Sequence, residues 1–153
     1  SNTVWTATLE QELSRISPQL EKPDRPGHPV AVIKRGDHFL VEVTLNRMST
    51  VKLLIDTGAS LTTLSHSSFV DLPQANFNYR GSRMFNTAGG LTRGDIYRAS
   101  SIKLGEMQLN DIDIAVIDYP SASNVDGLLG MNVLRNYRFE IDQDDKLLHL
   151  QPR

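Results

Sequence analysis

The residue best suited to take part in a chemical reaction is Asp56, in the stretch LLIDTGAS at positions 53–60. Three consecutive apolar residues precede it, which predicts a strand buried on both faces, and a second apolar run starts at Leu61. A carboxylate between two such runs would be partly desolvated and would need hydrogen bonds, for example from the amides of residues 58–60 or the Ser60 hydroxyl. The small residues of the turn leave room for a ligand above Asp56. Because Asp and Gly are also common turn residues, the tripeptide Asp-Thr-Gly alone is more simply explained as an ordinary turn.

Two other stretches stand out by their composition. The segment FNTAGGLTRGDIY, at 85–97, contains a glycine pair at 89–90 that suits the tip of a tight hairpin and permits close approach to a bound peptide. An ordinary loop is the alternative interpretation of this segment. The segment GLLGMNVLRNY, at 127–137, has apolar residues at helical spacing and is also consistent with plain core packing.

Metal and thiol chemistry are not indicated. The chain contains no cysteine, which excludes disulfides, thiolate catalysis and Cys-based zinc sites. The four histidines, at 28, 38, 66 and 149, are scattered, and none has a partner four residues away. The acidic stretch DQDD at 142–145 lacks the glycine and terminal Glu of a calcium-binding loop, so a hairpin turn explains it better. We therefore expect neither a metal nor another cofactor.

The composition limits the classes of protein that this chain can belong to. It has 153 residues, the size of one domain, with 39% hydrophobic and 22% charged residues, which is typical of a globular fold rather than a disordered one. The net charge is −2 and the basic residues form no stripe, so we expect no nucleic-acid partner. No apolar run approaches the roughly 18 residues needed to cross a bilayer.

The pattern along the chain predicts two unequal parts. Residues 1–29 combine apolar residues at helical spacing with the proline-rich stretch EKPDRPGHP, which predicts an N-terminal helix followed by a linker. From residue 30 to 153 short β-rich runs recur about every ten residues, with one or two short helices, which predicts an all-β, barrel-like domain. The runs are at 30–34, 39–45, 51–55, 96–104, 112–118, 139–141 and 147–150.

The two motifs together resemble those of the retropepsin-like aspartic proteases, and the bacterial single-domain members in particular. LLIDTGAS is followed about seventy residues later by VDGLLGMNVL, and the glycine-bearing segment between them falls where this family places its flap hairpin. The resemblance covers roughly Val30 to Leu150. It implies a closed acid-protease barrel with one short C-terminal helix, preceded here by the N-terminal helix.

The resemblance implies roles for the residues of the turn. Asp56 would be the catalytic residue. Thr57 would hydrogen-bond across a dimer axis, Gly58 would offer its amide to the carboxylates and its carbonyl to substrate, and Ala59 and Ser60 would shape the turn. The flap residues that would contact substrate are Thr87, Ala88, Gly89 and Gly90, and the residues that would brace the turn from beneath are Leu128, Leu129 and Gly130.

Aspartic proteolysis requires two carboxylates that share one proton, so that one activates water and the other polarises the scissile carbonyl. This chain has one Asp-Thr-Gly and is too short for two such lobes. We therefore expect a homodimer, in which each chain supplies one Asp56, that hydrolyses extended peptide or protein substrates at mildly acidic pH.

Two alternatives remain open at this point. The same fold would also suit a non-catalytic peptide-binding or dimerisation module. The N-terminal segment would suit a spacer in a longer, membrane-tethered chain, and an anchor removed from the N-terminus would place the protein in the cell envelope or periplasm of a bacterium.

Overall fold

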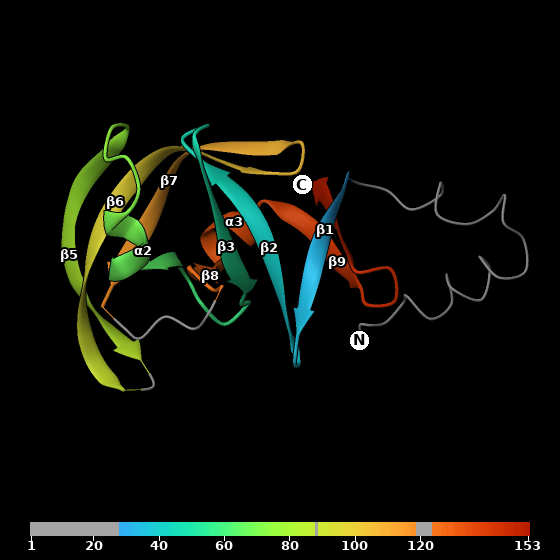
Figure 1. Cartoon of the computed structure of the whole chain (residues 1–153), viewed down its shortest axis with the longest axis horizontal. Helices are drawn as coiled ribbons and strands as arrows, with labels where there is room; N and C mark the ends of the chain where they lie inside the picture. Colours follow the sequence, from blue (N-terminus) through green and yellow to red (C-terminus); the bar gives the residue numbers. More distant parts are fainter. Residues whose placement is uncertain (1–27, 88, 119–123) are drawn as a thin grey trace, which may run out of the picture.

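The computed structural model describes residues 28–87, 89–118 and 124–153. The described part consists mostly of β-strands with two short helices (Figure 1). The strands are β1 (His28–Arg35), β2 (His38–Leu45), β3 (Ser49–Ile55), β4 (Thr62–Ser65), β5 (Phe77–Thr87), β6 (Gly90–Leu104), β7 (Met107–Ile117), β8 (Gly127–Leu129), β9 (Tyr137–Asp142) and β10 (Leu147–Pro152). The helices are α2 (His66–Val70) and α3 (Met131–Leu134). The predicted N-terminal helix lies outside the described residues.

All ten strands belong to one strongly curved sheet, in the order β5-β6-β7-β4-β8-β3-β2-β1-β10-β9. A further pairing joins the far half of β6 to the end of β2, with Leu45 opposite Ile102. The hairpin of β5 and β6 extends to one side of the molecule, and the hairpin of β9 and β10 lies on the other side, beside β1 (Figure 1).

The sequence predicts one of the two helices, α3, whereas its periodicity does not indicate the other, α2. The predicted C-terminal helix is present as α3, but Leu128 and Leu129 belong to β8, because they pair with β3 instead of continuing the helical spacing. Helix α2 is a single turn that the periodicity did not indicate. Its start is set by Ser65, whose hydroxyl accepts a hydrogen bond of 3.2 Å from the amide of Ser68. No helix in the described part is long and apolar enough to span a membrane.

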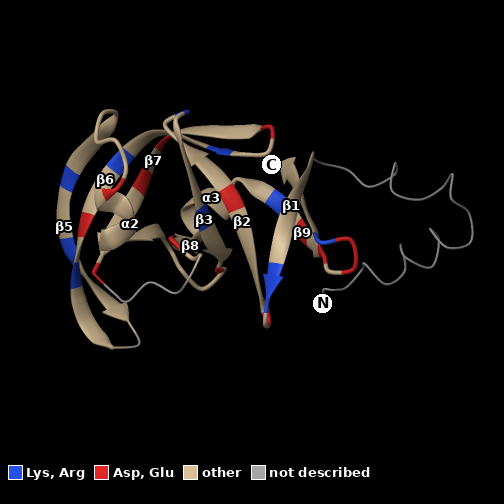
Figure 2. Ribbon diagram, viewed as in Figure 1, with Lys and Arg blue, Asp and Glu red and all other residues tan. Residues whose placement is uncertain are grey.

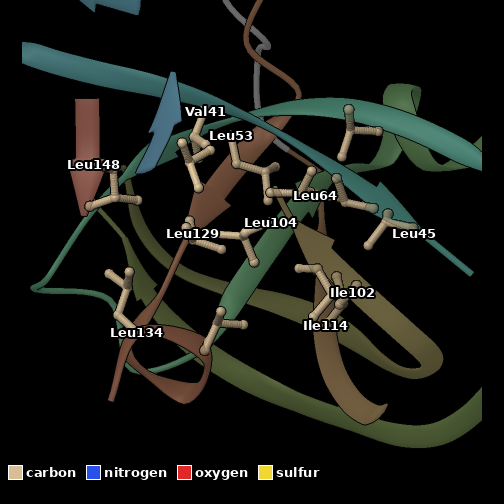
Figure 3. Close-up of a cluster of buried hydrophobic side chains, with 14 of the residues drawn as sticks. Val41, Leu45, Leu53, Leu64, Ile102, Leu104, Ile114, Leu129, Leu134 and Leu148 are labelled. Atoms are coloured by element: carbon tan, nitrogen blue, oxygen red, sulfur yellow. The ribbon is translucent and has the colours of Figure 1, made fainter. Parts of the chain in front are cut away.

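The core fills the space enclosed by the curved sheet. Leucines and isoleucines from β2, β3, β4, β6, β7, β8 and α3 converge there (Figure 3). Leu53, Leu64 and Leu129 are fully buried, and these three residues come from the strands on either side of Asp56 and from the strand between them. A smaller apolar cluster, formed by Ile96, Ala115 and Ile117 with Leu61 and Phe85, lies beside it. The strand that carries Asp56 is therefore anchored on a packed interior.

Ile102 tests how much the pairing of β2 with β6 contributes to the core. Its side chain is fully buried, so the variant Ile102→Ala should lose about 2–5 kcal/mol of unfolding free energy, through lost burial and the cavity left behind. Urea denaturation followed by circular dichroism measures this loss. Ile33→Ala is the matched control, because Ile33 is 47% exposed, and an equal loss in both variants would contradict the assigned core.

Candidate active site

Asp56 is positioned by a short strand that lies between two others. Strand β8 runs parallel to β3, with Leu129 opposite Ile55, and antiparallel to β4, with Leu128 opposite Thr63. The amide of Asp56 continues this ladder by donating to the carbonyl of Leu129 at 3.0 Å. The main chain of Asp56 is thus fixed by a segment about seventy residues away in sequence.

The turn leaves the Asp56 side chain accessible. One carboxylate oxygen, Oδ1, accepts a hydrogen bond of 2.9 Å from the amide of Gly58. The carbonyl of Asp56 accepts from the amide of Ala59 at 3.2 Å, which closes the turn. Asp56 is half-buried, whereas Thr57, Gly58 and Ser60 are exposed. The carboxylate is therefore held by a main-chain amide while its remaining lone pairs face the open side of the turn.

Two glycines allow the strands around the turn to approach closely. A Cβ atom on Gly127 would lie 1.9 Å from the carbonyl oxygen of Thr63, and one on Gly130 would lie 2.5 Å from the carbonyl of Leu61. No side chain fits at either position without moving backbone. The close approach also allows the carbonyl of Ala59, in the turn, to accept a 2.7 Å hydrogen bond from the amide of Met131. Gly127 and Gly130 are therefore needed because the main chains lie so close together, not because the backbone must be flexible there.

Asn132 ties the turn to its surroundings, a role that the sequence analysis missed. Its side-chain oxygen accepts from the amide and the hydroxyl of Thr62, at 2.8 and 2.9 Å, and its Nδ2 donates to the carbonyl of Asp113 at 2.8 Å. Its own amide donates to the carbonyl of Ser60 at 3.1 Å. The only available signal was a polar side chain in a four-residue apolar helix, and its partners lie 19 and 70 residues away.

The other Asp-Gly pair does not offer a free carboxylate. Asp126 accepts from the amide of Lys52 at 2.8 Å through one oxygen and from the hydroxyl of Ser68 at 2.8 Å through the other. Its main chain also bonds to Lys52 and Ser65. Asp126 is therefore occupied in holding β8 against β3 and α2.

A groove of about 1040 Å³ lies over the turn and is lined by many of the predicted site residues, although Thr57 and Gly90 are not among its lining residues. Its walls come from the turn, from the β5–β6 hairpin and from the end of β7. The lining residues include Asp56, Gly58, Ala59, Ser60, Leu61, Phe85, Asn86, Thr87, Gly89, Thr92, Ile117, Asp118 and Leu128. Leu129 and Gly130 are buried beneath the turn.

The hairpin of β5 and β6 supplies one wall of the groove, and its strands end at Thr87 and Gly90. Thr87 pairs with Gly90, and its hydroxyl donates to the carbonyl of Gly90 at 2.7 Å. Gly90 has φ of +107°, which only glycine adopts readily. Ala88 lies outside the described residues. Phe85 lines the groove, whereas Tyr97 packs against the rings of Phe69 and Tyr79 on the opposite side of the sheet.

Among the described residues no group of three or more His, Cys, Asp or Glu side chains is arranged to hold a metal ion. The polar groups that line the groove are the carboxylates of Asp56 and Asp118, the hydroxyl and amide side chains of Ser, Thr and Asn residues, and main-chain groups. Such a set can bind extended backbone and move protons.

The chain belongs to the aspartyl protease family, whose sequence profile matches residues 41–133. The structure is similar to that of a retropepsin-like aspartic protease from Rickettsia conorii, with a TM-score of 0.58 and 25% identity over 82% of this chain and 89% of that one. It is also similar in fold to the EIAV protease complexed with the inhibitor HBY-793, with a TM-score of 0.55 and 18% identity over 67% of this chain and 90% of that one. No curated protein matches the chain. The family match and the two structural similarities together show that the fold is retropepsin-like and that the protein is an aspartic-type hydrolase.

Asn132 provides a test of how the turn is held. Asn132→Ala removes every side-chain hydrogen bond described above and leaves the amide of the fully buried Thr62 without its partner. We expect a loss of about 2–4 kcal/mol in unfolding free energy, because an unsatisfied buried donor carries its full desolvation cost. Chemical denaturation measures it, with Asn78→Ala as control, since Asn78 is exposed on β5. A loss below about 1 kcal/mol would show that Asn132 is dispensable.

Proposed function

We propose that this protein is an aspartic endopeptidase in which Asp56 from each of two identical chains forms the catalytic dyad. The observation that carries the proposal is the position of Asp56: its carboxylate is held by the Gly58 amide and lines a groove that is also lined by the β5–β6 hairpin. The described fold contains a single turn of this kind, so a second one requires a second copy of the chain.

The proposed chemistry needs two carboxylates about 3 Å apart with one proton between them, because like charges at that distance cannot both be ionised. The ionised member takes a proton from water, and the protonated member donates a hydrogen bond to the scissile carbonyl. Attack of the water then yields a tetrahedral intermediate, with no metal and no covalent enzyme intermediate. Thr57 and Gly58 are both exposed beside Asp56, which supports the proposed contacts of Thr57 with the partner's turn and of Gly58 with the substrate.

The groove supports an extended peptide as substrate. Thr87 and Gly89 of the hairpin line the same groove as Gly58 and Ala59 of the turn, and Gly90 pairs with Thr87. Main-chain groups of the hairpin and the turn would pair with a peptide added between them. The proposed flap also includes Ala88, which lies outside the described residues. Leu128, Leu129 and Gly130 would brace the turn when substrate binds.

The strand order supports one mode of dimerisation. Of the two C-terminal strands, β10 has both edges occupied, by β1 and β9, whereas β9 is the last strand of the described sheet and has one free edge. We propose that two β9 edges pair antiparallel about a two-fold axis, which would make an isologous interface.

The same strand order bears on barrel closure and on the domain boundary. The pairing of β6 with β2 links β2, β3, β8, β4, β7 and β6 in a ring, which supports a closed barrel. Strand β1 starts at His28, two residues before the predicted boundary at Val30. We propose that residues 28–153 form the protease domain and that the preceding residues are a helix and linker that would also suit a tether.

Asp56→Asn tests the catalytic assignment. Replacing the carboxylate that each chain contributes to the proposed dyad should lower kcat/KM on unstructured peptides by at least about 10³-fold, because neither water activation nor carbonyl polarisation can proceed with amides. The assay is run at about pH 4 to 6, where a dyad can hold one proton. Asp37→Asn, in the exposed β1–β2 turn, is the matched control. Full turnover by the Asp56 variant would exclude the assignment, and peptide binding without turnover by the unaltered protein would support a binding module.

Subunit mixing tests whether the two carboxylates come from different chains. Adding a tenfold excess of Asp56→Asn chains to unaltered protein, under conditions that allow exchange, should remove most of the activity, because nearly all unaltered chains then pair with an inactive mate. An equal excess of Asp37→Asn chains should not reduce it. If the activity withstands the Asp56 variant, the second carboxylate lies in the same chain, and Asp118, which also lines the groove, becomes the candidate.

A further inference from the structure

The groove over Asp56 has an outer end on the sheet formed by β5, β6 and β7. Partners directly opposite each other in a sheet lie on the same face, and here Phe85 is opposite Thr92, while Gly94 is opposite both Arg83 and Ile117. Phe85, Thr92 and Ile117 all line the groove. Arg83 lies two residues before Phe85 on β5, so its side chain is on the same face and extends the groove wall outward.

The position of Arg83 is supported by a glycine and a ring. A Cβ atom on Gly94 would lie 2.7 Å from Cε2 of Phe85, so the ring fills the space that a side chain on Gly94 would occupy. The guanidinium carbon of Arg83 lies 5.7 Å from the centroid of the same ring, within the range of a cation–π interaction. The positive charge is thereby held at the rim of the groove.

Beyond this rim lies a second, smaller hollow of about 250 Å³, lined by Arg80, Gly81, Ser82, Arg83, Ile96 and Asp113. Basic residues are spaced along β5 beside it (Figure 2). Arg80 is the extra residue of an irregularity in the pairing of β5 with β6, between Tyr79 and Gly81.

The charges around the hollow do not cancel. Arg98 donates to Asp113 at 2.9 Å, and this hydrogen bond raises the pKa of Arg98, so both charges of that pair are committed to each other. Arg93 contacts Asp95 at 3.6 Å. Arg80 and Arg83, both exposed, form no ion pair with a carboxylate in the described part of the chain. The hollow therefore carries excess positive charge, while the groove nearer to Asp56 carries the carboxylate of Asp118.

We propose that this hollow is an outer substrate subsite in which Arg83, assisted by Arg80, binds an acidic side chain of the peptide, several residues from the scissile bond. The planar guanidinium can form paired, charge-assisted hydrogen bonds with a carboxylate. Asp118 would disfavour an acidic residue closer to the scissile bond, so the preference is confined to the outer position. The subsite selects among substrates of the proposed endopeptidase and thus rests on that function.

The test uses peptide pairs that differ only by Glu or Gln at one position, scanned three to five residues to either side of the cleavage site. The assay is run at about pH 6, because the substrate Glu, with a usual pKa of about 4.3, must be ionised. For the unaltered protein, kcat/KM should favour Glu by about five- to tenfold at one outer position, and less at 0.5 M salt, where screening weakens an exposed contact. In Arg83→Gln this ratio should fall to about one, and in Arg83→Glu it should favour Lys over Gln.

Arg93→Gln is the matched control. Arg93 is an exposed arginine on the neighbouring strand, opposite Met84 and so on the other face of the sheet, and its loss should leave the preference for Glu unchanged. A preference for Glu that survives in Arg83→Gln, or that is lost equally in Arg93→Gln, would overturn the proposal. Absence of any preference for Glu in the unaltered protein would do the same.

A binding measurement separates the failure of this proposal from the failure of the proposed function. Fluorescence anisotropy with Asp56→Asn protein compares the same labelled Glu and Gln peptides without requiring turnover. Tighter binding of the Glu peptide, abolished by adding Arg83→Gln to the Asp56→Asn background, supports the subsite even if no peptide is ever cleaved. Equal binding of both peptides, alongside normal cleavage by the unaltered protein, would exclude the subsite and leave the protease assignment in place.

Discussion

The site depends on the insertion of β8 between β3 and β4. Only there does the amide of Asp56 find its acceptor, the carbonyl of Leu129, while the carbonyl of Ala59 finds its donor, the amide of Met131. The contact between Ala59 and Met131 brings the main chains closer than a side chain at 130 permits, and the insertion of β8 beside Thr63 of β4 does the same at 127, which explains glycine at both positions. A turn that looks local in sequence is therefore held by a strand and a helix from the far end of the chain.

The electrostatics of the site follow from this arrangement. Asp126, the acidic residue nearest to β8, is saturated by the amide of Lys52 and the hydroxyl of Ser68, so it stabilises the scaffold. Asp56 has one carboxylate oxygen bound to an amide and is otherwise open to the groove. The hydrogen bonds of the Asp126 carboxylate thus stabilise the fold, whereas the Asp56 carboxylate remains available. The proposed dyad would use Asp56.

The arrangement of charge along the groove divides it into regions. The carboxylates of Asp56 and Asp118 lie in the groove, at the turn and after the end of β7. Arg80 and Arg83, which have no described acidic partner, lie on β5 at the hollow beyond the groove. Such a gradient would orient a peptide along the groove before any chemistry occurs. Phe85 links the two regions, because its ring lines the groove and lies beneath the guanidinium of Arg83.

The sequence by itself determined the strand-rich domain, the site-forming motif at Asp56, the hairpin with its glycines and the short helix α3, because these depend on local periodicity and on residues that a turn requires. It did not reveal α2, the role of Asn132, the strand assignment of Leu128 and Leu129, or the outer position of Arg83. Helix α2 begins at a local cap, Ser65, that the apolar periodicity does not register. The other three features were decided by tertiary structure, because each depends on contact between segments 11 to 74 residues apart, and no local pattern records which strand will lie beside which.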